Sequence, residues 1–449
     1  MRAESLAPLR FSRPGMGLSI LEGCFAMAPQ TFNAGVFLTG FALMLGVDSW
    51  ALGLLAAVPA ICQAAQLTTP MLMQRGVCRK QLVIWGASLG RYLWLPIALT
   101  PFLPLAASAK LGLFLALLAI ATMLSQASGV GWNDWMSEVV PDAERGRYFG
   151  LRNALTGMVG LVMLWCGSRW LDAVKASGHE ALGFSVLLGL GLLGAIGSQV
   201  ALTNQPHPMR FALKRDRRSA LAAPLGNAAF LRLLALYFVW MAVTGLLGPF
   251  SYAYALQTLH VSYATIGMHA SIVAALGTVS QPFWGRMIDK RGPQATIALA
   301  MVPICIHPLY WTVMHPGFTW LLWCDAVSNG VFWAGVNLAI LTMLMEIAPR
   351  GERAAYMGLW NCGMGIATSG AALIGGRLLM EQGHWSLAVG PRAIGMWTLL
   401  LIVGFVGRVV CLALFASLPR VQAPTLTIDT WAADPAASPA PIGDVPAGA

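Results

Sequence analysis

Four polar or amphipathic residues recur at intervals of four inside the apolar stretch 317–345. They are Asp325, Asn329, Trp333 and Asn337. Side chains four positions apart share one face of an α-helix, so this spacing predicts a polar stripe. A charged group in hydrocarbon costs about 2.5 to 3.5 kcal/mol on insertion scales and therefore faces a partner or water. We predict that the stripe lines a wet cavity in which the Asp325 carboxylate carries a proton or attracts a cation.

Two other apolar stretches carry similar stripes. The stripe in 17–45 is Glu22, Ala26, Gln30 and Asn33, and the stripe in 229–256 is Tyr237, Trp240, Thr244, Gly248 and Ser251. Glu22 lies about two helical turns from the start of its stretch, so a proton-coupling role in the cavity and a simple ion pair both stay open. The predicted cavity residues are Gln30, Asn33, Trp240, Thr244, Asp325, Asn329, Trp333 and Asn337.

Three further ionisable residues lie inside apolar stretches. We expect Arg91 to pair with a carboxylate of the first or fourth stretch, and Arg408 to snorkel or pair locally. His269 is interpreted as a packing residue, with a proton relay as the alternative. No arginine lies on a predicted stripe. Because organic phosphates and dicarboxylates need fixed cationic anchors, a neutral polar or an amphipathic cationic solute is favoured.

Motifs for catalysis or cofactor binding are missing from the sequence. The eight cysteines are scattered without a CxxC pair, and we interpret them as small packing residues. There is no HExxH or GxSxG motif and no phosphate-binding loop. We expect no catalytic residues, no cofactor and no metal site.

The composition determines the class of protein. Of 449 residues, 57% are hydrophobic and only 10% are charged, whereas soluble domains carry about 25% charged residues. The apolar residues form blocks of about 20 or more, long enough to cross a bilayer as helices. The net charge of +10 sits in short clusters between these blocks, which indicates membrane topology rather than a nucleic-acid partner.

The apolar blocks predict an all-α membrane protein with twelve transmembrane helices in two pseudo-symmetric six-helix bundles. The helices are predicted at 17–45, 49–73, 81–104, 109–136, 150–173, 180–203, 229–256, 261–284, 294–314, 317–345, 353–380 and 391–418. The predicted divisions are an N-terminus at 1–16, bundles at 17–203 and 229–419, a basic linker at 204–228 and a disordered tail at 420–449. The tail is rich in Pro and Ala and has little to bury.

The basic residues indicate an orientation. With twelve spans, both termini lie on one side, and the loops and termini of that side hold 21 of the 28 Lys and Arg residues. The opposite loops hold five. Cytoplasmic loops carry the excess of positive charge, so we predict cytoplasmic termini in the inner membrane of a bacterium.

An internal repeat relates the two halves. The segments EVVPDAERGRYFGLRN at 138–153 and EIAPRGERAAYMGLWN at 346–361 match at a constant offset of 208. Each follows the fourth span of its own half. Parallel repeats of this kind predict a central site between the halves that opens alternately to either side.

The loop GRMIDKRG at 285–292 resembles the signature loop of the major facilitator superfamily. The first-half copy at 67–80 is degraded, because Met73 stands where the acidic residue would be. The resemblance covers residues 17–418 and implies membrane transport of a small solute. Two patterns of drug/proton antiporters are absent, an arginine in the fourth helix and a Gly- and Pro-rich motif in the fifth. Their absence disfavours a standard multidrug antiporter.

In that family these loops form an ion-pair lock that closes the cytoplasmic side. We expect Asp289, Glu346 and Arg353 to form such a lock in the second half, and Glu138 with Arg145 a weaker one in the first. The alternative is that these charges cap helices and signal topology. The predicted gate residues are Glu138, Arg145, Gly285, Asp289, Arg291, Gly292, Glu346 and Arg353.

Together these observations predict a secondary active transporter that moves a small organic solute by alternating access. Proton coupling through Asp325 or Glu22 is a hypothesis. The alternatives are a facilitator-type efflux pump for amphipathic or cationic compounds and a membrane sensor built on a transporter fold. The expected partners are the solute, the bilayer and protons, with no nucleic acid, and we expect the chain to act as a monomer. Substrate, direction and coupling ion stay open.

Overall fold

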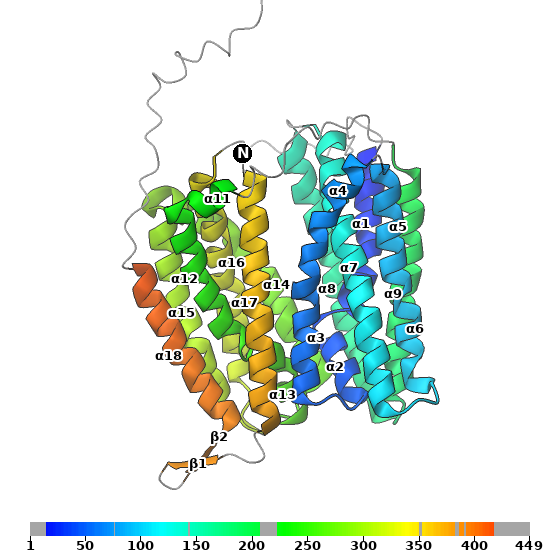
Figure 1. Ribbon diagram of the computed structural model, residues 1–449. Coiled ribbons are helices and arrows are strands. Elements are labelled where there is room, and N and C mark those ends of the chain that lie inside the picture. The colour runs from blue at the N-terminus through cyan, green and yellow to red at the C-terminus, as the bar shows by residue number, and fades with distance from the viewer. Residues whose placement is uncertain are drawn as a thin grey trace, which may run out of the picture.

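The computed structural model describes residues 15–75, 77–141, 144–206, 222–349, 353–381, 386–389 and 392–416. Most of these residues are helical, and the helices form two groups side by side (Figure 1). The predicted tail at 420–449, most of the predicted linker and nearly all of the predicted N-terminus lie outside the described residues.

The first group holds the elements of the N-terminal half. They are α1 (Gly15–Phe32), α2 (Gly35–Met44), α3 (Ser49–Cys62), η1 (Gln63–Leu67), α4 (Thr68–Gln74), α5 (Arg79–Tyr92), α6 (Trp94–Leu99), η2 (Thr100–Phe102), α7 (Ala107–Val139), α8 (Arg145–Ala176) and α9 (Glu180–Asn204). Within this half α1 packs against α8 and α9, and α5 packs against α7.

The second group holds the elements of the C-terminal half. They are α11 (Ala222–Gly226), α12 (Ala228–Gly245), η4 (Gly248–Phe250), α13 (Ser251–Gln257), α14 (Tyr263–Arg291), α15 (Pro293–Val313), α16 (Leu321–Ile347), α17 (Arg353–Met380), β1 (Ser386–Val389), β2 (Arg392–Gly395) and α18 (Met396–Ala416). Here α16 packs against α14 and α15, and α18 packs against α15 and α12.

Ten segments of the described chain are long and apolar enough to cross a membrane. These segments carry large exposed apolar side chains, among them Leu193 at 64%, Trp85 at 58% and Val200 at 56% exposure. Because a soluble protein rarely exposes so much apolar surface, these side chains belong in lipid. The chain is an integral membrane protein.

Some predicted helices are divided. The span predicted at 17–45 is interrupted between α1 and α2, where Gly35 has a φ of +57°, a conformation that glycine adopts without steric cost. The span predicted at 49–73 is divided into α3, η1 and α4. The helix predicted at 391–418 begins too early, because 392–395 forms β2, which pairs antiparallel with β1 in a hairpin. The pattern of apolar residues does not predict such breaks, because it continues across them.

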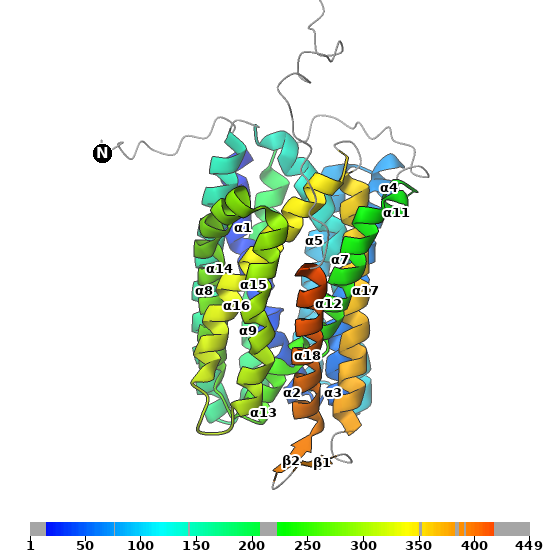
Figure 2. The same cartoon turned by 90° about the vertical axis from the view of Figure 1, so that its left-hand side faces the viewer.

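The two halves meet mainly at one end of the molecule. Helices α4 and α11 lie at one end, called here the α4/α11 end, and the β1–β2 hairpin lies at the other, called the hairpin end (Figures 1 and 2). Two pairs of helices make the largest contacts between the halves, and both contacts begin at the hairpin end. Helix α3 of the N-terminal half packs against α17 of the C-terminal half, and α8 packs against α14. A Cβ on Gly53 would lie 2.7 Å from the carbonyl oxygen of Ala372, and one on Gly376 would lie 2.7 Å from that of Ser49. Glycine therefore permits this close approach of backbones.

Candidate functional site

Asp325 is the centre of a buried polar cluster in the C-terminal half. It is the fifth residue of α16, near the hairpin end, and is 3% exposed. His269 Nε2 of α14 lies 3.0 Å from its Oδ2. Asn329 Nδ2 donates to the same oxygen at 2.8 Å, and Trp311 Nε1 of α15 donates to Oδ1 at 3.3 Å. The carboxylate thus has partners from three helices, as a buried charge requires.

This cluster borders a cavity of about 340 Å³. Of the predicted cavity residues, Thr244, Asp325, Asn329 and Trp333 line it. His269 lines it as well, so its imidazole is a functional candidate rather than only a packing group. The cavity is large enough for a small organic molecule, since ligand cavities measure roughly 300 to 1,000 Å³.

Two residues line this cavity that the sequence did not predict as cavity residues, His307 and Arg408. His307 of α15 lines the cavity, and its Nε2 lies 2.6 Å from Ser328 Oγ. It sits in an apolar stretch between Pro303 and Pro308, and no spacing signal points to it. Arg408 of α18 also lines the cavity and donates to the carbonyl oxygen of Ile304 at 3.0 Å, which is the local pairing expected for it.

Two predicted stripe residues lie apart from Asp325. Trp240 is fully buried, with its ring centroid 6.1 Å from that of Trp333, and it does not line this cavity. Asn337 borders a different cavity of about 510 Å³, with Gln63 and Trp360. An α-helix turns about 100° per residue, so a four-residue step drifts by about 40° and three steps by about 120°. The far end of the stripe therefore faces another direction.

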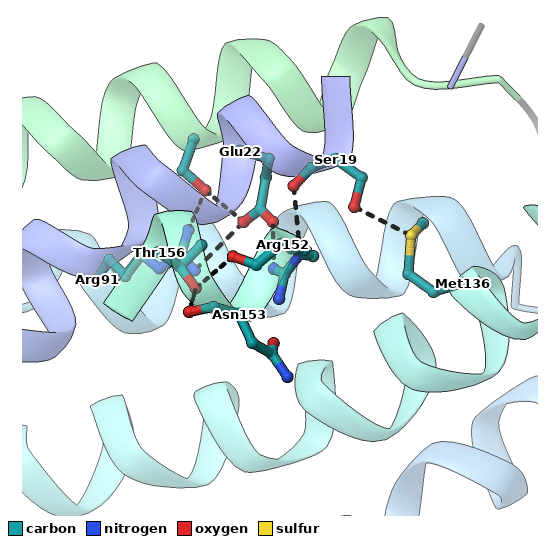
Figure 3. Close-up of polar contacts among 8 residues, drawn as sticks. Ser19, Glu22, Arg91, Met136, Arg152, Asn153 and Thr156 are labelled. Carbon is teal, nitrogen blue, oxygen red and sulfur yellow. Dashed lines mark hydrogen bonds and ion pairs between the residues drawn. The ribbon is translucent and has the colours of Figure 1, made fainter. Parts of the chain in front are cut away.

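Glu22 is the centre of a second buried cluster, in the N-terminal half (Figure 3). It is 4% exposed. Arg152 Nη2 of α8 lies 3.5 Å from its Oε2, and Arg91 Nη2 of α5 lies 3.8 Å from its Oε1. Ser198 Oγ of α9 donates to Oε1 at 2.8 Å. The predicted pairing of Arg91 with a carboxylate of the first span is confirmed, and Glu22 is ion-paired.

Glu22 also borders a cavity of about 570 Å³, so it is ion-paired and lies at a cavity, while its role in proton coupling stays a prediction. The predicted residues Gln30 and Asn33 line this cavity together with Arg91, Arg152 and others. No arginine lies on a predicted stripe, yet two arginines from other helices line this cavity, so the argument against an anionic solute loses its basis. Arg152 lies at the boundary between a basic loop and a helix in the sequence, where a topology signal and a cavity residue look alike. In the structure it is the eighth residue of α8 and points at Glu22.

The predicted gate residues are only partly described. Asp289 and Glu346 are exposed, and no ion pair joins these two carboxylates to another described side chain. The side chains of Glu138, Arg145 and Arg353 lie outside the described residues. Gly292 has a φ of +80° between α14 and α15, which explains the glycine there. Arg291 is exposed at the end of α14, and a Cβ on Gly285 would meet nothing within 4 Å. The lock stays a prediction.

The shortest hydrogen bonds between the described parts of the two halves lie at the hairpin end instead. Asp172 of α8 accepts hydrogen bonds from the backbone N–H groups of Tyr263, at 2.8 Å, and Ala264, at 2.7 Å. Both belong to the first turn of α14, where free N–H groups and the helix dipole favour a negative charge. Tyr263 Oη also donates to Glu180 Oε1 at 2.9 Å. Sequence spacing contains no signal for these contacts, because they join residues more than 80 positions apart.

Two groups of membrane-crossing helices, each holding a buried carboxylate beside a cavity, define a membrane transport protein. The chain belongs to the Major Facilitator Superfamily, whose sequence model matches residues 20–324 and again 233–438. It is a transporter of small molecules in a lipid membrane and not an enzyme. A comparison with curated proteins gave no match.

Solved transporters share the fold. The crystal structure of a D-xylose–proton symporter is similar with a TM-score of 0.71 and 12% identity, over 92% of this chain and 99% of that one. A crystal structure of a variant of the nucleoside transporter NupG has a TM-score of 0.67 and 13% identity, over 90% and 99%. A bacterial homologue of the iron transporter ferroportin, in an inward-facing state, has a TM-score of 0.62 and 15% identity, over 89% and 96%.

Proposed function

We propose that this chain is a secondary active transporter that moves a small organic solute by alternating access and is coupled to protons at the His269–Asp325 pair. The observation that carries the proposal is the 3.0 Å contact between these two side chains at the edge of a cavity inside the membrane. An intramembrane ionisable pair beside a cavity is the usual element of a proton relay. The D-xylose–proton symporter with the same fold is consistent with such coupling.

The pair can change the contacts around it when it gains a proton. Without a proton, the Asp325 carboxylate holds Asn329, Trp311 and His269 as donors. A protonated carboxyl becomes a donor itself and attracts these three groups less. Protonation therefore loosens the attachment of α14 and α15 to α16 at this point. A solute that completes the network in one protonation state only would be transported together with the proton.

The same helix also contacts the other half. Gly267 lies two residues before His269 on α14 and directly faces Ser168 of α8, which leaves no room for a side chain there. A shift of α14 when the pair changes its protonation would disturb this contact and the nearby bonds to Asp172. We propose that this link connects proton binding to opening at the hairpin end, as alternating access requires.

We further propose that the α4/α11 end is cytoplasmic, since the basic loops of the sequence gather there. In this orientation the described contacts between halves close the outer side. The predicted lock of Asp289, Glu346 and Arg353, with Glu138 and Arg145 in the first half, would then form only after the cytoplasmic side closes. The exposure of Asp289 and Glu346 is consistent with a lock that is open in this state.

The proposal is tested in proteoliposomes with an imposed pH gradient, with uridine and D-xylose as the first radiolabelled solutes. We expect Asp325→Asn to lose at least tenfold in gradient-driven accumulation while solute exchange without a gradient continues. Glu381→Gln is the matched control, because it neutralises an exposed carboxylate that pairs with Arg377 one helical turn away. Full accumulation with an unchanged pH profile in Asp325→Asn would show that the proton binds elsewhere.

A second candidate function is efflux of amphipathic or cationic compounds. A largely apolar cavity of about 550 Å³ lies between α1, α8 and α14, with Met27, Leu161 and Ala270 in its wall. Its lining includes Met158 and Val279, which are 63% and 74% exposed, so an apolar compound could reach this cavity from outside. Energised uptake of a lipophilic cation such as ethidium into inverted vesicles would favour efflux, and its absence would favour the polar solute.

A further inference from the structure

The cavity of the N-terminal half contains more positive than negative charge. Among the described residues that line it, Glu22 is the acidic one, whereas Arg91 and Arg152 are both basic. The two guanidinium groups are each 15% exposed, so water screens them little. Among the described residues that line the cavity, one carboxylate between two guanidinium groups leaves one positive charge uncompensated. Such a charge is costly inside a membrane protein unless a mobile anion neutralises it.

Arg152 is held loosely by its described partners. Its Nη2 lies 3.5 Å from Glu22 Oε2, and its Nε lies 3.4 Å from the carbonyl oxygen of Ser19. Both distances are long for hydrogen bonds, which for N–H donors are typically about 2.9 to 3.0 Å. A guanidinium carries five N–H donors, so several remain for a ligand.

Trp132 supplies a second donor in the same cavity. The Nε1 donor of Trp132 is buried and has no hydrogen-bond acceptor among the described residues. The Arg152 guanidinium lies over the Trp132 ring, 4.4 Å from its centroid. A buried indole N–H beside a guanidinium with free donors is a pair of donors that one oxyanion would satisfy. Gly23 leaves room for the guanidinium beside α1, because a Cβ there would lie 2.8 Å from Arg152 Nη2.

We propose that this cavity binds the acidic group of a small organic anion, a carboxylate or a phosphate ester, with Arg152 as its anchor and Trp132 as its second donor. The inference deepens the proposed transport function and rests on it. Glu22 competes with the anion for Arg152. In the empty site Arg152 pairs with the Glu22 carboxylate, and in the loaded site it pairs with the acidic group of the solute. Gln30 and Asn33, further along α1, offer amide groups to the rest of the solute.

The competition makes the inference testable by binding alone, in detergent and without transport. We would measure affinity from tryptophan fluorescence and thermal shift with matched pairs of probes that differ in their acidic group: uridine and uridine monophosphate, D-xylose and D-xylonate. We expect at least one acidic probe to bind at least tenfold more tightly than its neutral partner. Preference for the phosphate or for the carboxylate member identifies the kind of anion.

Three variants separate an anchor from a structural role. Arg152→Gln should lower the affinity for the acidic probe at least tenfold, and Arg152→Lys should recover part of it. Glu22→Gln should raise this affinity, because it removes the competing carboxylate while keeping the volume. Arg147→Gln is the control, since Arg147 lies on the same helix, is exposed and does not line the cavity.

The inference is overturned if no acidic probe binds more tightly than its neutral partner, or if Glu22→Gln and Arg152→Gln both lower the melting temperature without changing affinity. In that case the cluster only holds α1, α5 and α8 together. Proton-driven accumulation of neutral uridine or D-xylose would then still support the proposed function, so the two failures are distinguishable.

Discussion

The contact between Asp172 and the first turn of α14 offers the sharpest test of how the two halves close. The carboxylate lies on α8 of one half and accepts two backbone hydrogen bonds from α14 of the other, at 2.8 and 2.7 Å. If the halves separate at the hairpin end during transport, both bonds must break. Removing the carboxylate should therefore favour the form that is open at this end.

The size of the effect follows from the geometry. A hydrogen bond to a charged group contributes about 1.5 to 3 kcal/mol, and the lower value applies because Asp172 is only half-buried. Asp172→Ala loses both bonds, about 3 kcal/mol, which shifts the equilibrium roughly 100-fold toward the open form because about 1.4 kcal/mol corresponds to a factor of ten. Asp172→Asn keeps one neutral acceptor and should lose about half of this free energy, roughly a tenfold shift.

The assay is a distance measurement across the hairpin end. Spin labels at Ser177→Cys and Thr258→Cys, in a background without the native cysteines, report the separation of α8 from α13 by double electron–electron resonance. Both positions are exposed and close to the contact. We expect Asp172→Ala to add a population with a longer distance between the labels. In Asp172→Asn this longer-distance population should be present but smaller. Glu381→Gln, an exposed carboxylate after α17, is the control and should leave the distribution unchanged.

A folded Asp172→Ala protein with the wild-type distance distribution would refute the reasoning. It would mean that apolar packing between α3 and α17 closes this end and that the hydrogen bonds only follow it. A shift of equal size in Glu381→Gln would also refute it, because the effect would then come from the loss of any surface charge.

Two further predictions concern the fold and the gate. Gly376→Ala should destabilise the protein by about 1 to 3 kcal/mol, because its Cβ would lie 2.7 Å from the rigid carbonyl oxygen of Ser49. Gly112→Ala is the control and should not destabilise it, because a Cβ there would meet nothing within 4 Å. Thermal unfolding in detergent compares the two variants. If the lock exists, Asp289→Lys should leave stability unchanged but prevent closure of the α4/α11 end and slow transport at least tenfold. Unaltered transport would show that Asp289 acts only as a topology signal.

The sequence was sufficient for the class and the overall architecture because the constraints involved are local. Crossing hydrocarbon requires about 20 apolar residues in a helix with its backbone groups satisfied internally, and this requirement is visible in any window of the chain. The repeat at 138–153 and 346–361 indicated two related halves, and the structure and family confirm that fold. Helix breaks were less predictable, because Gly35 and the strand at 392–395 leave the apolar pattern unchanged.

Part of the site was predictable for the same reason. The polar stripe that contains Asp325, Asn329 and Trp333 is a feature of one helix, and these residues do line one cavity. Asn337 does not, because the drift of a four-residue repeat around the helix turns it away. The role of His269 stayed open, since a single histidine in an apolar stretch does not reveal which neighbour it meets.

The pairings themselves were decided by tertiary structure. Glu22 meets Arg152 across 130 positions of sequence, and His269 meets Asp325 across 56. Such a meeting depends on how far each helix is rotated and how closely it approaches its neighbour, and both depend on packing by residues elsewhere, such as Gly23 beside Arg152. Spacing within a helix states which residues share a face, whereas the arrangement of the helices determines what that face meets. The sequence therefore suggests that Arg152 is a charged loop residue, whereas in the folded protein its guanidinium lines a cavity.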